Sequence, residues 1–213
     1  SSIATLGDMS HGLSFAGLNN TGDLSDSRIS TRGDNSFALD LGPGSQVQGD
    51  QLTLSTSGQF SNAINVLENS TLSLSNSTLL TSGNTAHGVY VRGTSPSERA
   101  VATLTNVMVN TTGDNAIGVN INRNATATLD TVQITTTGAN AFGIWVPDAD
   151  SELIGRDVTI NASGDGAIGV FTQLGGKASL NGGAIHTTGS NAYALYAGNT
   201  SSIDAQNLSL QVG

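Results

Sequence analysis

A glycine returns along this chain at nearly constant spacing, and this period constrains the fold more than any other feature. Successive members are 26, 25, 25, 30, 25, 26 and 25 residues apart: Gly7, Gly33, Gly58, Gly83, Gly113, Gly138, Gly164 and Gly189. A repeat of about 20–50 residues is typical of solenoid proteins, in which each repeat buries its apolar face only by stacking on its neighbours. We call these residues the ruler glycines and count positions from them.

Apolar residues keep fixed positions relative to the ruler glycines. Four residues before them stand Ile3, Ile29, Leu54, Leu79, Val109, Ile134, Ile160 and Ile185. Six residues after them stand Leu13, Leu39, Ile64, Val89, Val119, Ile144, Val170 and Leu195, and most residues at position eight are also apolar. Alternation of apolar residues in short runs rich in β-branched side chains indicates strands.

A further apolar group in mid-coil, represented by Leu72, Leu104, Leu129 and Leu180, adds another strand to each repeat. The sequence therefore predicts an all-β fold, a right-handed parallel β-helix of about eight coils of roughly 25 residues, forming one domain over residues 1–213. Equivalent strands of successive coils should pair in parallel ~4.8 Å apart. We expect each ruler glycine at a corner that requires positive φ or a close approach of two backbones.

Three local features refine this prediction. Residues 93–98 contain the five extra residues of the long interval and Pro96, and we expect them to form a small loop outside the column. Threonine stands two positions before nearly every ruler glycine. This column shares the parity of the aliphatic one, so we expect it inside rather than displayed as an ice-binding array. Asx residues before the third strand (Asp26, Asn76, Asn106 and Asp157) should cap turns.

Composition excludes several classes of partner and chemistry. Only 11% of residues are charged and the net charge is −9, so we expect no nucleic-acid partner, since phosphate binding needs a basic face. No cysteine is present, which excludes disulfide and thiolate chemistry. No apolar run of about 18 residues is present to span a membrane. We find no signal peptide, and we expect the chain to be part of a longer protein.

The coil sequence resembles that of a known family. The segment TTGDNAIGV at 111–119 recurs as TTGANAFGI at 136–144 and TTGSNAYAL at 187–195. It is similar to the coils of pertactin-like autotransporter passenger domains of Gram-negative bacteria, and the resemblance covers essentially the whole chain. It implies an upstream signal peptide, a downstream outer-membrane translocator barrel that would be the only link to a membrane, and export through the periplasm and outer membrane to the cell surface. It also implies roles in adhesion, self-association or complement evasion, and some members are enzymes.

One candidate binding motif is Arg32-Gly33-Asp34, a tripeptide that pertactin-like adhesins can carry and that integrins recognise on a tight turn. A structural interpretation competes with it. Gly33 is a ruler glycine, and Gly-Asp recurs at the same corner as Gly7-Asp8, Gly113-Asp114 and Gly164-Asp165. Apart from Leu6, only Arg32 departs from the Ser or Thr usual at its position.

A second candidate is a column of aromatic residues seven positions after the ruler glycine. Its aromatic members are Tyr90, Trp145, Phe171 and Tyr196. Both flanking positions hold inward aliphatic residues, so this position should point outward beside a Gly or Ala at position five. An exposed apolar strip of this kind indicates a binding partner. The alternatives are that the rings stack on one another for stability or that the loop at 93–98 covers them.

Signals for catalysis, metals or cofactors are weak, and we expect none of the three. His11 and His87 share a column but lie three coils apart, ~14 Å, too far to hold one metal ion. Both have the parity of inward residues, so we expect buried polar side chains. Residues 148–152 carry three acids near one corner but lack most ligands of a calcium-binding loop.

The sequence thus favours a non-enzymatic, surface-exposed passenger that acts as an adhesin or virulence factor. Its partner would be a host cell-surface protein, a glycan or another copy of the passenger. The alternatives are a carbohydrate-active β-helix enzyme, which would need clustered acids or bases on one face, and a structural stalk whose activity lies outside residues 1–213.

Overall fold

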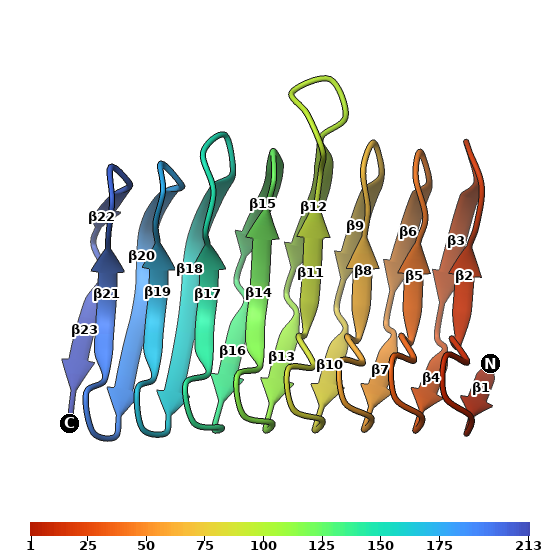
Figure 1. The fold of residues 1–213 in the computed structure, drawn as a ribbon, viewed down its shortest axis with the longest axis horizontal. Coiled ribbons are helices and arrows are strands. Elements are labelled where there is room, and N and C mark those ends of the chain that lie inside the picture. The colour runs from red at the N-terminus through yellow and green to blue at the C-terminus, as the bar shows by residue number, and fades with distance from the viewer.

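The computed structural model describes residues 1–213 as a column of stacked coils made of 23 strands and no helix (Figure 1). Most coils contribute three short strands separated by corners, and equivalent strands lie side by side along the column. The prediction of an all-β parallel solenoid of about eight coils with a period near 25 residues is confirmed. No helix of the structure is long and apolar enough to cross a membrane.

One face of the column is an eight-stranded parallel sheet. Its strands, in spatial order, are β2 (Leu13–Phe15), β5 (Leu39–Leu41), β8 (Ile64–Val66), β11 (Val89–Arg92), β14 (Ile117–Asn122), β17 (Phe142–Val146), β19 (Ile168–Thr172) and β21 (Tyr193–Ala197). We call this the front sheet, because it faces the viewer in Figure 1.

The remaining strands form the other two sides of the column. One side contains β3 (Thr21–Ser25), β6 (Gln46–Asp50), β9 (Thr71–Ser75), β12 (Ala100–Thr105), β15 (Ala125–Asp130) and β22 (Ser202–Gln206). The other contains β1 (Ser2–Thr5), β4 (Arg28–Thr31), β7 (Thr53–Thr56), β10 (Thr78–Thr81), β13 (Met108–Thr111), β16 (Gln133–Thr136) and β23 (Ser209–Val212). Strands β18 (Glu152–Ser163) and β20 (Lys177–Thr188) are longer and run through both sides.

The strands pair in the register that the apolar columns predict. Ile134 of β16 is opposite Val109 of β13 and Ile160 of β18, and Val119 of β14 is opposite Val89 and Ile144. These stacked side chains belong to one continuous core of 39 buried residues. The core is shared by all the coils, so functional side chains must lie on the outer faces or in the corners.

Close approach of backbones explains the ruler glycines. A Cβ atom added to Gly58 would lie 2.0 Å from the carbonyl oxygen of Gly33, and one added to Gly138 would lie 2.0 Å from that of Gly113. The left-handed residue of the corner comes two positions later, for example Asn35 (φ 51°) and Asn115 (φ 55°). Of the two reasons predicted for the glycine, close approach applies from Gly33 onward, and positive φ applies as well at Gly164 (φ 137°) and Gly189 (φ 115°).

Polar ladders stabilise a second set of corners, as the Asx residues predict. The Asn76 amide donates to Asp50 (2.7 Å), and the Asn106 amide donates to Asn76 (2.7 Å). Asp26, Asn76, Asn106 and Asp157 all have positive φ. Hydrogen bonds from Ser75 and Asn76 also lower the pKa of the exposed Asp50 carboxyl, because they stabilise its ionised form.

Two further predictions are confirmed. The threonines two positions before the ruler glycines are buried from the second coil onward, except where Ala162 replaces one: Thr31, Thr56, Thr81, Thr111, Thr136 and Thr187. The segment at 93–98 joins β11 to β12 as a loop that extends beyond the column (Figure 1). Inside that loop the Thr94 hydroxyl and the Ser95 hydroxyl both donate to the Glu98 carboxylate.

Candidate functional site

An aromatic cluster covers the outer face of β17, β19 and β21 near the end of the front sheet. Parallel pairing sets Trp145 beside Phe171, and Phe171 beside Tyr196. The Trp145 and Phe171 rings are stacked with centroids 6.3 Å apart, and Phe171 meets Tyr196 edge to face at 5.1 Å. Three of the four predicted aromatic residues therefore lie together.

Two residues that sequence reasoning missed complete the cluster. Phe142 lies 5.4 Å from the Phe171 ring and 6.2 Å from Trp145, and Tyr193 lies 5.3 Å from Tyr196. Both stand four positions after a ruler glycine, and both fall within the repeated coil segment. We define the aromatic cluster as the five residues Phe142, Trp145, Phe171, Tyr193 and Tyr196. The sequence does carry a signal for the two missed residues, because position four holds an aromatic residue in three coils.

The expected Gly/Ala floor beside the rings is wrong, because position five faces the core. A Cβ atom added to Gly143 would lie 2.4 Å from Cγ2 of Ile160, and one added to Gly118 would lie 2.4 Å from Cγ2 of Ile134. Position six is also buried, as Ile144 shows. The residues at positions five and six therefore both face inward. The inward and outward alternation of side chains shifts by one residue there, so position four faces outward.

Exposure within the aromatic cluster increases toward the last coil. Tyr193 and Tyr196 are 48% and 41% exposed, while Phe142, Trp145 and Phe171 are half-buried by one another. The Trp145 indole Nε1–H is buried and has no acceptor in the chain. The cluster thus combines mutual stacking, one of the predicted alternatives, with an apolar surface still open to solvent.

Tyr90 lies apart from the aromatic cluster. It is opposite Asn120, which is in turn opposite Trp145, so two strand spacings of ~4.8 Å separate Tyr90 from Trp145. The Tyr90 ring instead stacks on His87 at 6.1 Å. Asn120 and Ile117 are both buried between the two aromatic groups. The predicted aromatic column is therefore interrupted, and only its last three members form a surface.

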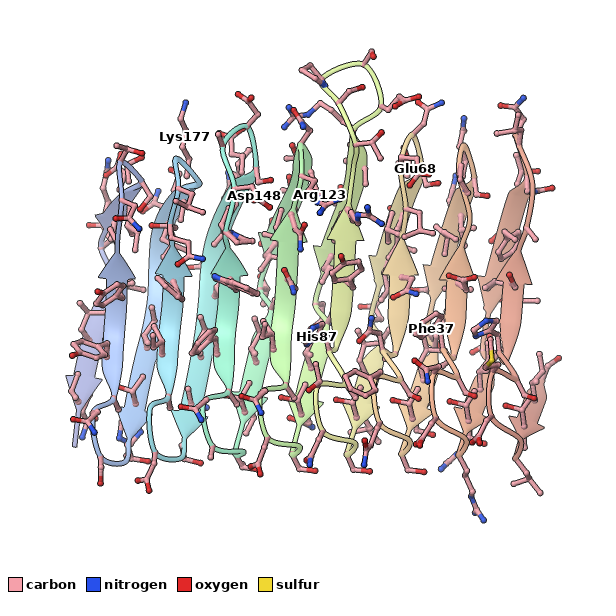
Figure 2. The ribbon with its side chains drawn as sticks, in the orientation of Figure 1. Phe37, Glu68, His87, Arg123, Asp148 and Lys177 are labelled. Carbon is pink, nitrogen blue, oxygen red and sulfur yellow. The ribbon has the colours of Figure 1, made fainter.

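His87 is a largely buried histidine on the outer side of the front sheet. Its Nδ1 accepts a hydrogen bond from the Ile117 backbone N–H (3.1 Å), and burial lowers the pKa of its imidazole to about 4. The predicted burial is only partial, since the residue keeps some exposure to solvent. The predicted inward direction is wrong, because position four turns outward. His11 makes the equivalent bond with Phe37 N–H. Figure 2 shows Phe37 and His87 at the same height on the column.

The Arg32-Gly33-Asp34 tripeptide lies at the lower corner of the second coil. Gly33 is buried under the first coil, and an added Cβ atom would lie 2.1 Å from the Gly7 carbonyl oxygen. The Asp34 carboxylate accepts a hydrogen bond from Gln59 N–H (2.7 Å), and Asp34 N–H donates to Asp8 (2.9 Å). The same arrangement recurs with Asp114 and Asp165. These contacts favour the structural interpretation of the motif, and integrin binding stays a prediction.

The structure brings together no group of three or more His, Asp or Glu side chains able to hold a metal ion. In the acidic corner at 148–152, the Asp148 carboxylate accepts a hydrogen bond from Arg123 N–H (3.1 Å), and the Asp150 carbonyl accepts one from the Arg99 guanidinium (3.0 Å). Figure 2 places Glu68, Arg123, Asp148 and Lys177 at the upper corners of the column, away from His87. The charged side chains of these corners therefore lie apart from the aromatic cluster.

Comparison with known proteins supports the architecture. No protein-family model and no curated protein matches the chain. Its fold is similar to that of a chain in the cryo-EM structure of the Vag8–C1 inhibitor complex, with a TM-score of 0.54 and 19% sequence identity. The likeness covers 95% of this chain and 60% of that one, so the column described here spans about three fifths of the chain it matches. At this identity the comparison shows the fold.

Proposed function

We propose that this chain is a segment of an autotransporter passenger that is displayed on the surface of a Gram-negative bacterium and binds a host protein through the aromatic cluster. It acts as an adhesin or virulence factor and not as an enzyme. The observation that carries the proposal is the contiguous, partly exposed surface of five aromatic side chains on β17, β19 and β21.

The physical argument begins with the cost of exposing these rings. Isolated exposed apolar residues are ordinary, but a contiguous apolar patch on a soluble protein usually marks an interaction site. Tyr and Trp are enriched in binding hot spots, because they bury a large area at a small cost in conformational entropy. The hydrogen-bonded sheet beneath holds these rings on a rigid support, which limits the entropy lost on association.

The assignment to autotransporter passengers rests on two independent supports. The first is the repeated coil segment at 111–119, 136–144 and 187–195, which resembles pertactin-like passengers. The second is the fold shared with a chain of the Vag8–C1 inhibitor structure. That protein is described in complex with another protein, and this is why we propose a host protein here in preference to a glycan or a second copy of the passenger.

The proposal is tested by displaying the segment on bacteria that lack adhesins and measuring attachment to cultured epithelial cells. We expect the Trp145→Ala/Tyr196→Ala variant to lose most of the attachment seen with the wild type. Phe60→Ala is the matched control, because Phe60 is 52% exposed but lies on a corner far from the cluster. It should attach like the wild type.

The other outcomes identify the alternatives. If the Asp34→Glu variant alone lost attachment, the result would support integrin binding by the tripeptide. If the aromatic variant lost cell-to-cell aggregation and kept attachment, the cluster would mediate self-association. If deglycosylation of the host cells abolished attachment of the wild type, the partner would be a glycan. Absence of attachment by the wild type would favour a stalk, and turnover of a polysaccharide would favour the enzyme. Each of these results would contradict the proposal as stated.

A further inference from the structure

A groove on a different side of the column has no part in the proposed function. It is a hollow of 370 Å³ on the outer face of β4, β7, β10 and β13, and only one of the residues that line it is hydrophobic. Its volume falls in the range of small-ligand sites, about 300–1,000 Å³. Across the four strands it extends over three spacings of ~4.8 Å, or ~14 Å along the column axis.

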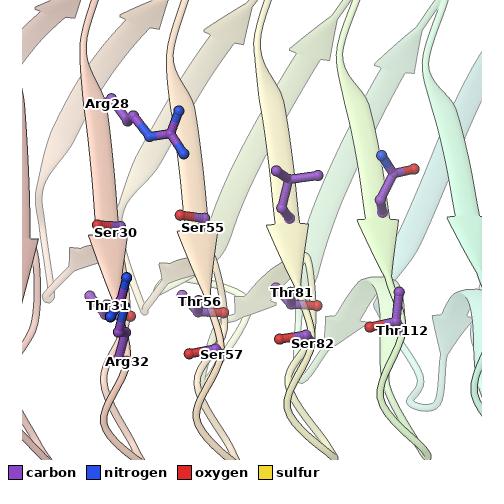
Figure 3. Close-up of a pocket in the computed structure, with 12 residues that line it drawn as sticks. Arg28, Ser30, Thr31, Arg32, Ser55, Thr56, Ser57, Thr81, Ser82 and Thr112 are labelled. Atoms are coloured by element: carbon purple, nitrogen blue, oxygen red, sulfur yellow. The ribbon is translucent and has the colours of Figure 1, made fainter. Parts of the chain in front are cut away.

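Two arginines stand at one end of this groove. Arg28 and Arg32 are four residues apart and bracket the outward Ser30 of β4, so both side chains are on the outer face and both are exposed. Figure 3 shows Arg28 extending from β4 toward β7. The backbone N–H groups of the two residues donate to the carbonyls of Ser1 and Thr5, and no hydrogen bond or ion pair within the structure holds either guanidinium group.

The chain has only seven basic side chains, so two of them in one groove form a distinct local charge. The acid closest in sequence to Arg32 is Asp34, and its carboxylate already accepts the Gln59 N–H. A guanidinium presents a planar set of donors that matches a carboxylate in a two-point contact. Either guanidinium group is therefore suited to a carboxylate of a ligand in the groove.

The rest of the groove is lined by two rows of side chains, which are hydroxyl or amide groups except for Leu80. Ser30 and Ser55 form one row with Leu80 and Asn110, which are paired in register. Ser57, Ser82 and Thr112 form the other row, next to Arg32 (Figure 3). The backbone N–H groups of Ser57, Ser82 and Thr112 donate to carbonyls of the preceding coil, at 3.0–3.2 Å.

This lining distinguishes between two classes of anionic ligand. A peptide could not add a strand here, because the backbone groups of these interior strands are already paired. It would also find a single apolar contact, at Leu80. A sugar needs what the groove offers, a succession of hydroxyl groups that exchange hydrogen bonds with its own, with one small apolar surface for its C–H face.

We propose that the groove on β4, β7, β10 and β13 binds a short saccharide that carries a carboxylate. Arg28 or Arg32 contacts the carboxylate, and the hydroxyl groups of Ser30, Ser55, Ser57 and Ser82 contact the sugar hydroxyls. The net charge of −9 opposes heavily charged polymers, but charges beyond about 8 Å are screened at physiological ionic strength. A ligand with one or two carboxylates is therefore favoured. The site is independent of the aromatic cluster.

The test uses 3′-sialyllactose and digalacturonate as probes and isothermal titration calorimetry as the measurement. We expect at least one acidic sugar to bind, with an affinity that falls as the salt concentration is raised. Neutral lactose should bind at least about tenfold more weakly, because hydrogen bonds to the charged carboxylate contribute most of the discrimination. Binding of 3′-sialyllactose would identify a sialic acid as the source of the carboxylate, and binding of digalacturonate would identify a uronic acid.

Variants locate the site. Arg28→Ala/Arg32→Ala should lose about tenfold or more in affinity for the acidic sugar while keeping the circular dichroism spectrum of the wild type. Arg156→Ala is the matched control, since Arg156 is an exposed outward arginine on β18, and it should bind like the wild type. Trp145→Ala/Tyr196→Ala should also bind normally, which separates this site from the proposed function.

Four results would overturn the inference. They are the absence of binding by both acidic sugars, unchanged binding by the double arginine variant, an equal loss with Arg156→Ala or with the aromatic variant, and tighter binding of an acidic hexapeptide than of either sugar. None of them would affect the attachment experiment, because its deciding variant, Trp145→Ala/Tyr196→Ala, lies on the front sheet.

Discussion

The first four coils and the last four coils share one backbone but present different outer surfaces. At positions four and seven the first half carries mainly polar residues, among them His11, Asn62 and Asp40, whereas the second half carries all five residues of the aromatic cluster. At position three the first half has Ser10, Ser36 and Ser61, where every coil from the fourth onward has Ala. The change at position three comes with Ala86 in the fourth coil, and the aromatic cluster begins with Phe142 in the sixth coil.

The two halves also satisfy their buried hydroxyl groups differently. In the first half, Thr31 donates to the Ser36 carbonyl (2.6 Å) and Thr81 donates to that of Ala86 (2.9 Å). In the second half, the hydroxyls of Thr111, Thr136 and Thr187 are buried without a partner. The comparison teaches that the glycine stack and the aliphatic core determine the fold, while the outward columns and inner polar bonds are free to differ.

The largest expected effect tests the core that both halves share. Val119→Asp in the second half and Ile64→Asp in the first should each abolish folding or cost about 4 kcal/mol or more, because both sites are fully buried and offer the charge no partner. Trp145→Ala should leave the protein folded. Urea denaturation followed by circular dichroism measures all three, and equal losses for Trp145 and Val119 would contradict the inward and outward assignment.

The next effect tests the glycine stack. Gly58→Ala and Gly138→Ala should each destabilise the column by about 2 kcal/mol or more, because each added methyl group would overlap a carbonyl oxygen of the preceding coil. Gly7→Ala is the matched control. In residues 1–213 Gly7 lies in the first coil, and its added Cβ would meet only the Ser10 side chain, with the hydroxyl at 3.1 Å. Thermal denaturation should rank Gly7→Ala far closer to the wild type, and equal costs at all three positions would refute close approach as the reason.

A pH-dependent effect follows from His87 at the boundary between the halves. Its pKa is lowered from 6.5 to about 4 in the folded protein, so the unfolded chain binds the extra proton between these values. Stability from this group is fully present above pH 6.5 and is lost as pH falls toward 4, by up to about 3 kcal/mol. His87→Asn, which matches Asn62 of the preceding coil, should remove this part of the pH dependence.

Urea denaturation at pH 7 and at pH 4.5 gives the comparison. The wild type should lose more stability than His87→Asn between the two conditions. Identical pH dependence in the two proteins would mean that His87 is not desolvated in the folded column.

The smallest effect separates the two halves directly. Thr81→Val removes a hydrogen bond and should cost about 1 kcal/mol, whereas Thr111→Val removes a hydroxyl that has no partner and should be neutral or slightly stabilising. Both sites are buried in the same column of adjacent coils, so the difference between the two variants is the informative quantity. Equal costs would show that the halves do not differ inside the column.

Most of the fold could be predicted from the sequence because a solenoid repeats one local rule. The 25-residue period, the aliphatic columns at Ile134 and Val119, and the loop at 93–98 all follow from counting along the chain. What failed was the parity argument near position five. A glycine such as Gly143 could lie on the outer surface beside the rings or pack tightly against Ile160 in the core. The sequence is compatible with both, and only the three-dimensional path of the chain shows that it packs in the core.

The candidate site was predictable only in part. Tyr90 and Trp145 both stand seven positions after a ruler glycine, so the sequence gives no reason to separate them. In the sheet Asn120 lies between them, and Tyr90 stacks on His87. Phe142 and Tyr193 join the cluster through side-chain contacts across columns, which spacing alone does not show. The groove beside Arg28 and Arg32 likewise depends on four strands that are distant in sequence.

The most direct test of the account is hydroxyl-radical footprinting of the chain displayed on bacteria, free and attached to epithelial cells. Tyr193 and Tyr196 are exposed in the second half, and Phe60 and Met9 are exposed in the first half as internal controls. The account predicts that attachment protects Tyr193 and Tyr196 from modification and leaves Phe60 and Met9 unchanged. Protection of Phe60 or Met9 with no protection of the two tyrosines would contradict it.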